Sequence, residues 1–309
     1  MFSAVPSEPR VPPTLPFKHL PEEFKVISPL SKFGMPFAPE ALSSVYRVVP
    51  VKNRHNLSLT WQLPPQFTNW RSDPTDYIGH LLGHEGSGSV LSALKRRGWA
   101  STIFAGIGHD GFTMASSHAL FSVTVGMTEE GVEKWEDIVE LVYSYIQMMK
   151  NIGGADGSKF PGYIFEELKV VGEFKFRFQE DEQPSELVED LADELSPCHA
   201  LPPEHLLDGS TLKFEFDGGE VMEIINKYLK CDNMRIDIMS SVFGRHSEYE
   251  GEGGEGGEEE EEEEGEKTLK PPTPPPKLPP YLNIADQIVE PIFGTRFWRS
   301  KLEPETVGR

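Results

Sequence analysis

Cysteine is scarce in this chain of 309 residues, which contains only Cys198 and Cys231. Two cysteines are too few for the disulfide framework of a small secreted domain, so we expect both thiols to be reduced. Long apolar runs are missing as well. No window approaches the roughly 18 residues of a membrane span, and Met1 to Pro16 lacks the apolar run of a signal peptide. These absences predict a cytoplasmic protein with no membrane partner.

Positive charge is also in short supply. The chain has 29 lysine and arginine residues against 50 aspartate and glutamate residues, which gives a net charge of −21. Such an acidic balance argues against nucleic acid as a partner, because its phosphates carry the same sign of charge. The excess is local, since Glu248 to Glu266 holds 12 glutamates and no other charged residue.

Composition and periodicity divide the chain into four segments. Residues 1–40 are rich in proline and lack periodicity, which is typical of a linker or arm. Residues 41–246 alternate between strand and helix patterns, which predicts an α+β domain with an antiparallel sheet and helices packed on one face. Residues 247–280 hold glycine, glutamate and proline with little to bury, so we expect a disordered acidic and proline-rich insertion. The aromatic residues of 281–309 predict a segment that packs back on the domain.

The clearest strand pattern is the alternation of apolar and polar residues from Leu57 to Leu63. This pattern indicates a strand buried on one side, and we expect it to form a hairpin with a strand at 45–51. The same reasoning predicts further strands at 99–105, 112–125 and 234–239, and helices at 73–85, 90–97, 128–149, 160–178, 184–195 and 218–229.

The most informative helix carries His80 and His84, which lie four residues apart on one face. This is the spacing of zinc ligands in HExxH and HxxEH metalloproteases, in which the glutamate is the catalytic base. Here Gly83 stands at the glutamate position of HxxEH, so the frame is present and the base is absent. Two ordinary helix histidines are the alternative, because a metal site also needs a third ligand and a second shell. We therefore expect no catalytic residue and no bound metal in this chain.

The run from Tyr77 to Trp99 reads YIGHLLGHEGSGSVLSALKRRGW. It resembles the second, non-catalytic domain of the insulin-degrading enzyme, nardilysin and pitrilysin family of zinc metallopeptidases. The likeness continues at 127–131 (MTEEG), 174–178 (FKFRF) and 290–295 (EPIFGT). It covers roughly 45–245 and 285–305.

The resemblance implies a division of labour between domains. Large members of the family are built from four related α+β domains around a closed chamber, and the first domain carries zinc and HxxEH. The second domain is a degenerate copy that forms part of the chamber wall. The resemblance thus implies that zinc and base come from another domain or chain, and that the partners are this catalytic domain and peptide substrates. Glu166 and Glu167 lie in a plausible place for the family's further zinc ligand.

The resemblance also points to a peptide-binding edge strand. In the family, the region that matches Phe104-Ala105-Gly106 and Ser117-His118 resembles an exosite, where the free amino end of a peptide adds to a sheet. This chain departs from the pattern, since Ala105-Gly106 replaces two adjacent glycines and Ser117-His118 replaces a glycine-led pair. A purely structural edge strand is the alternative.

Two other functions stay open at this point. The chain is a stand-alone pseudopeptidase that binds peptides, or an acidic adaptor that acts through 248–280. Peptidase activity of the chain alone is not expected, because the base is missing from HxxEH. The substrate, the oligomeric state and the role of the acidic tract are not specified by the sequence.

Overall fold

The computed structural model describes residues 35–108, 112–180, 183–195, 201–244, 279 and 281–302. The predictions of a linker over 1–40 and of an insertion over 247–280 therefore fall almost wholly outside the described residues. Within the described ranges, no helix is long and apolar enough to cross a membrane. The cytoplasmic location stays a prediction.

One sheet of seven strands forms the centre of the domain. Its order is β3-β4-β2-β5-β1-β7-β6, and every neighbouring pair is antiparallel except β1 with β5. The strands are β1 (Ser44–Val48), β2 (His55–Leu63), β3 (Ala100–Ile107), β4 (Ala119–Met127), β5 (Met234–Ser240), β6 (Ile288–Val289) and β7 (Arg296–Lys301).

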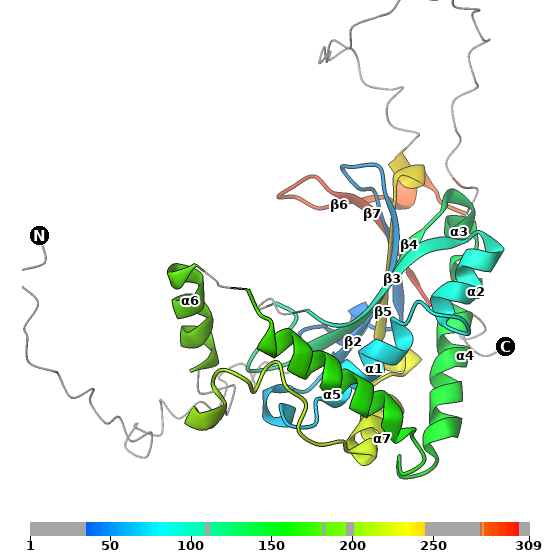
Figure 1. Cartoon of the computed structure of the whole chain (residues 1–309). Helices are drawn as coiled ribbons and strands as arrows, with labels where there is room; N and C mark the ends of the chain where they lie inside the picture. The colour runs from blue at the N-terminus through cyan, green and yellow to red at the C-terminus, as the bar shows by residue number, and fades with distance from the viewer. Residues whose placement is uncertain are drawn as a thin grey trace, which may run out of the picture.

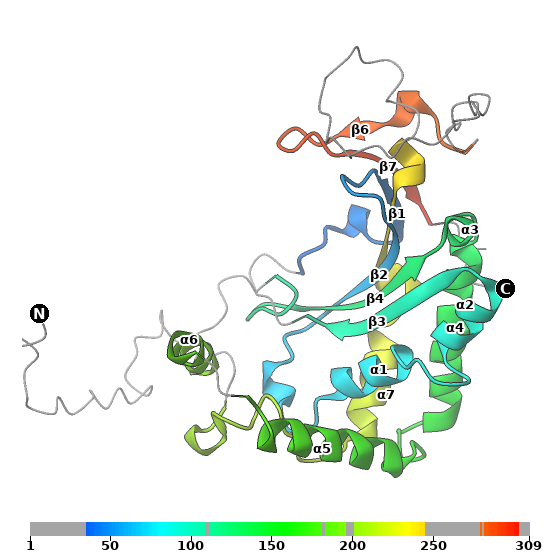
Figure 2. The same cartoon turned by 45° about the horizontal axis from the view of Figure 1, so that its top comes forward.

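The helices gather on one face of this sheet. Figures 1 and 2 show α1, α2, α4 and α7 against the sheet, α5 as an outer layer over α1 and α7, and α6 set apart from the body. The bounds are α1 (Pro74–Leu82), α2 (Val90–Arg97), α3 (Glu129–Glu133), α4 (Trp135–Gly153), α5 (Gly162–Arg177), α6 (Pro184–Glu194) and α7 (Gly218–Lys227). The predicted α+β class, with an antiparallel sheet and helices on one face, is confirmed.

The core lies between the helices and the inner face of the sheet. The apolar residues of β2 point into it, and Leu57, Leu59 and Trp61 have no exposed surface. Ser58 and Thr60 alternate with them on the opposite face, where the Ser58 and Thr124 hydroxyls are 3.1 Å apart. Burying each large apolar side chain stabilises the fold by roughly 1.5–3 kcal/mol. The alternation in the sequence thus sets which face of the sheet the helices cover.

Two expectations about the strands are wrong. The strand that precedes β2 does not form a hairpin with it, because β5 lies between β1 and β2 and pairs with both. The strand expected over 112–125 begins only at Ala119. Before it, Ala115 and His118 exchange backbone hydrogen bonds of 2.9 and 3.3 Å, and this tight turn ends the extended backbone.

The C-terminal segment packs on the domain through β7. This strand pairs antiparallel with β1, and Trp298 is only 4% exposed. The Trp298 indole N–H donates to the carbonyl oxygen of Asn283 at 2.8 Å, and its ring lies 6.5 Å from that of Phe243. A buried tryptophan with a satisfied N–H is a strong anchor. The four domain boundaries themselves stay predictions.

Candidate functional site

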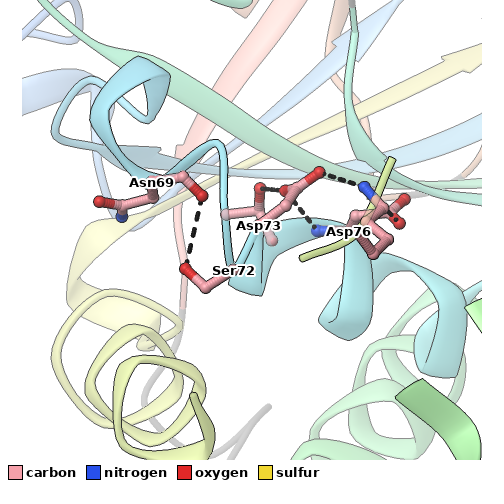
Figure 3. Close-up of polar contacts among 6 residues, drawn as sticks. Asn69, Ser72, Asp73 and Asp76 are labelled. Atoms are coloured by element: carbon pink, nitrogen blue, oxygen red, sulfur yellow. Dashed lines mark hydrogen bonds and ion pairs between the residues drawn. The ribbon is translucent and has the colours of Figure 1, made fainter. Parts of the chain in front are cut away.

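Helix α1 begins at a well-formed cap. Asp73 adopts a left-handed conformation (φ 37°), and its Oδ1 accepts hydrogen bonds from the Asp76 N–H at 3.2 Å and the Thr75 hydroxyl at 3.1 Å. Pro74 fills the first helical position, where no N–H is needed. Figure 3 shows this cap beside the hydroxyl of Ser72, which donates to the carbonyl oxygen of Asn69 at 3.4 Å.

A lysine from a distant part of the chain fixes the same helix end. Lys213 Nζ lies 2.6 Å from Asp73 Oδ2 and 3.1 Å from Asp76 Oδ2, and its side chain is 13% exposed. Burial alone would lower the pKa of Lys213, but the two aspartates raise it above its ordinary value. The lysine is therefore charged in the folded chain, and it ties the start of α1 to the segment before α7.

One face of α1 is made of glycine and touches β3. A Cβ added to Gly79 would come within 2.8 Å of the Ala105 carbonyl oxygen and 3.2 Å of Gly106 Cα. A Cβ added to Gly83 would come within 3.0 Å of the Gly79 oxygen and 3.3 Å of the Ala105 nitrogen. The backbones of helix and strand thus approach as closely as they do because these positions lack side chains. Gly83 is a packing residue as well as the position of the missing base.

The two histidines lie side by side, but only one is in the helix. The helix ends at Leu82, Gly83 is its C-cap, and the His80 and His84 rings meet edge to face with centroids 5.8 Å apart. The Gly86 N–H donates to His84 Nδ1 at 3.1 Å. A ring nitrogen that accepts a hydrogen bond carries no proton, so in the neutral ring the proton is on Nε2. In this arrangement His84 offers no free lone pair to a metal.

The histidines line a cavity between α1, α4 and α5, with a volume of about 290 Å³. Glu167 from α5 lines it too, whereas Glu166 does not. Of the two candidate glutamates, one therefore faces the histidines. Even so, within the described ranges no group of three histidine, cysteine, aspartate or glutamate side chains lies close enough to hold a metal ion.

These residues do not fit zinc. His84 uses Nδ1 for the Gly86 amide, no third ligand completes a set with His80, and Gly83 supplies no base. Zinc-assisted hydrolysis requires three protein ligands and a base beside the metal-bound water. No catalytic step is derived for this cavity.

The predicted peptide-binding residues of β3 lie on an edge of the sheet. β3 is the terminal strand on that side in the part of the chain that the structure describes. Phe104 is 59% exposed, and Gly106 has φ 145° with no atom within 4 Å of an added Cβ. This edge is therefore open beside Gly106, and it lies directly against the glycine face of α1.

Ser117 and His118 lie elsewhere, in the turn that precedes β4. The Ser117 hydroxyl is 2.8 Å from His118 Nδ1, and His118 Nε2 is 3.0 Å from the Phe112 carbonyl oxygen. Both side chains are thus engaged in holding their own turn. The hydrogen-bonding groups of the β3 edge do not include them, and their part in peptide binding stays a prediction.

Comparisons with known proteins agree with this picture. The family description "Peptidase M16 inactive domain" matches residues 10–157, and "Middle or third domain of peptidase_M16" matches residues 176–255. The chain belongs to the M16 peptidase family. The resemblance to a non-catalytic domain of this family is confirmed. The two M16 matches are separated within the span 41–246 that we expected to be one domain.

Relatives and solved structures cover different shares of the chain. Nardilysin of Pongo abelii is 35% identical over 192 residues, which are 62% of this chain and 16% of that protein. A nardilysin-like protein of Arabidopsis thaliana is 38% identical over 197 residues, 63% of this chain and 18% of the relative. The crystal structure of pitrilysin matches 87% of this chain and 23% of its own, with a TM-score of 0.65 and 18% identity. This M16 chain thus spans less than a quarter of each.

Sequence reasoning missed most of the cavity. Tyr145 from α4 and Tyr163 from α5 line it with the histidines, but they come from separate helices and no motif joins them. The Lys213 pair with Asp73 was missed for the same reason. Only the strong capping signal at Asp73-Pro74 was available in the sequence.

Proposed function

We propose that this chain is a non-catalytic module of an M16 metalloendopeptidase. It pairs with a catalytic M16 domain, forms part of the wall of a peptide-enclosing chamber, and captures peptide on the free edge of β3. The zinc, its ligands and the base for peptide hydrolysis come from that other domain or chain. The match to the inactive domain of the family supports the pairing.

The carrying observation is the open edge of β3 beside the glycine face of α1. An edge strand offers unpaired N–H and C=O groups, with which an extended peptide forms a further strand of the sheet. Gly106 leaves room for close approach, since nothing lies within 4 Å of a Cβ built there. Phe104, 59% exposed on this strand, supplies an apolar contact for an alternate side chain of the peptide.

The sheet face opposite the helices suits the inside of a chamber. It carries hydroxyl pairs such as Ser58 with Thr124, and the ion pair of Arg235 Nη2 with Asp237 Oδ1 at 2.6 Å. Burial raises the pKa of Asp237, and Arg235 opposes that rise. A polar face binds peptide backbone and side chains without the large apolar patch that promotes aggregation.

The test is the binding of an extended peptide to the full chain by isothermal titration calorimetry, with and without acetylation of its amino terminus. We expect acetylation to weaken binding, and Phe104→Ala to weaken it about fivefold, the loss of one moderate contact. Phe174→Ala is the matched control, because Phe174 is 64% exposed on α5, away from β3.

Three outcomes would count against the proposal. Equal binding of free and acetylated peptide would remove the role of the amino end. Equal effects of Phe104→Ala and Phe174→Ala would remove the role of β3. Loss of binding on deletion of 248–280, with β3 intact, would favour the acidic adaptor instead.

A further inference from the structure

The cavity between α1, α4 and α5 has an apolar floor and a polar rim. Three residues on the floor are nearly inaccessible: Tyr77 is 1% exposed, Met149 2% and Phe160 7%. His84, Tyr163 and Glu167 are exposed lining residues and form the rim. The chemistry of the cavity thus changes from apolar to polar between its floor and its mouth.

One polar atom on the floor is without a partner. Among the residues that the structure describes, the buried hydroxyl of Tyr77 makes no hydrogen bond. The Tyr77 ring is held in place by Phe216 and Phe160, with centroids 4.9 and 5.6 Å away, so the hydroxyl cannot swing to another group. Leaving a buried hydroxyl unpaired costs about 1–3 kcal/mol.

This hydroxyl faces the cavity. Burial and the nearby Tyr163 phenol raise the pKa of Tyr77 to about 12. The influence of Tyr163, a rim residue, shows that the Tyr77 hydroxyl is on the side of the opening. A group that enters from the rim therefore meets this oxygen at the end of its path.

We propose that the cavity binds an aromatic side chain with a polar tip, the tyrosine or tryptophan of a peptide. The ring packs on Phe160 and on the Met149 sulfur, and its O–H or N–H pairs with the Tyr77 hydroxyl. Aromatic rings favour thioether contacts, and buried Tyr and Trp need a partner for their polar atom. A volume of about 290 Å³ suits one side chain and excludes a folded element.

Other ligands fit the cavity less well. Glu167, the one carboxylate among the lining residues, is on the exposed rim, so a cation on the floor would be desolvated without a counter-charge. A purely apolar side chain would leave the Tyr77 hydroxyl unpaired. The site goes beyond capture on β3, because its residues come from α1, α4 and α5 and none from the sheet.

The test compares N-acetyl-tyrosinamide with N-acetyl-phenylalaninamide, which differ by one hydroxyl. The full chain is labelled with ¹³C in its methionine methyl groups, and the Met149 signal, assigned with Met149→Leu, is followed by NMR. We expect tyrosinamide to shift this signal and to bind about fivefold more tightly than phenylalaninamide, the effect of one hydrogen bond. In Tyr77→Phe this preference should vanish, while Tyr46→Phe, a residue of β1 outside the cavity, should keep it.

The expected pattern can fail in three ways, each of which overturns the proposal. An unchanged Met149 signal at saturating tyrosinamide would mean that no aromatic side chain enters. An equal preference in Tyr77→Phe and the unaltered chain would mean that this hydroxyl is not the partner. Tighter binding of N-acetyl-argininamide at the Met149 signal would replace the aromatic ligand by a cationic one. Because β3 is untouched, none of these results bears on the proposed capture of peptide there.

Discussion

Gly83→Glu restores the HxxEH pattern, and the structure predicts that it weakens the fold without creating a peptidase. The new Cβ would lie 3.0 Å from the Gly79 oxygen and 3.3 Å from the Ala105 nitrogen. Both are backbone atoms, so α1 and β3 must separate by a few tenths of an ångström. Overpacking of this kind costs about 1–3 kcal/mol.

Urea denaturation of the full chain measures this cost, and Gly162→Glu is its matched control. Gly162 begins α5, and no atom lies within 4 Å of a Cβ built there. A glutamate in the first turn of a helix is slightly favourable, so the control should be as stable as the unaltered chain or more so. A quenched peptide with added zinc should not be cleaved by Gly83→Glu, since no third ligand joins the histidines in the described part of the chain.

Two results would refute this reasoning. If Gly83→Glu matches Gly162→Glu in stability, the close approach of α1 to β3 does not depend on glycine. If Gly83→Glu cleaves the peptide and a chelator stops it, the two histidines form a competent zinc site after a single substitution. The first result would concern packing and the second chemistry, so the two can be told apart.

Three further substitutions test other contacts. Tyr77→Phe should raise the free energy of unfolding by about 1 kcal/mol in urea, because it removes an unpaired buried hydroxyl; a loss of stability would mean that the hydroxyl has a partner. Lys213→Met should cost about 1–2 kcal/mol at pH 7, since two carboxylates lose their counter-charge. The pKa of Lys213 is raised in the folded chain, so this difference should persist at neutral pH and shrink as pH rises past its ordinary value of 10.5; a constant difference would exclude the ion pair. Trp298→Ala should cost about 3–5 kcal/mol by thermal or urea unfolding, and a cost under 1 kcal/mol would show that β7 is not anchored by this ring.

Local patterns in the sequence predicted which residues form elements and which faces they bury. The alternation in β2 and β5 is a direct record of one buried face, and the cap at Asp73-Pro74 marks the start of α1. Such signals are visible because each depends on residues a few positions apart. The resemblance added the family, and with it the non-catalytic character of the domain.

Features that join distant segments were not predictable in this way. The hairpin expected for β1 and β2 failed because an alternating pattern gives a strand its buried face but not its neighbour. The helix ends before His84 because Gly83 caps it and His84 then binds the Gly86 amide, a local contact that periodicity does not report. The cavity combines three helices, so its floor could be found only in the folded chain.

The position of β1 has a consequence for how this chain is made. Its two neighbours, β5 and β7, are among the last strands to be synthesised. The Ser43 hydroxyl bonds the carbonyl oxygen of Cys231, 188 residues later, and the Arg47 side chain bonds the Ser300 hydroxyl, 253 residues later. A ribosome therefore delivers β1 long before either partner exists, and during that interval its edges are open to other chains. A nascent or truncated chain that stops before β7 would carry β1 as a permanent unpaired edge, the form most prone to aggregate.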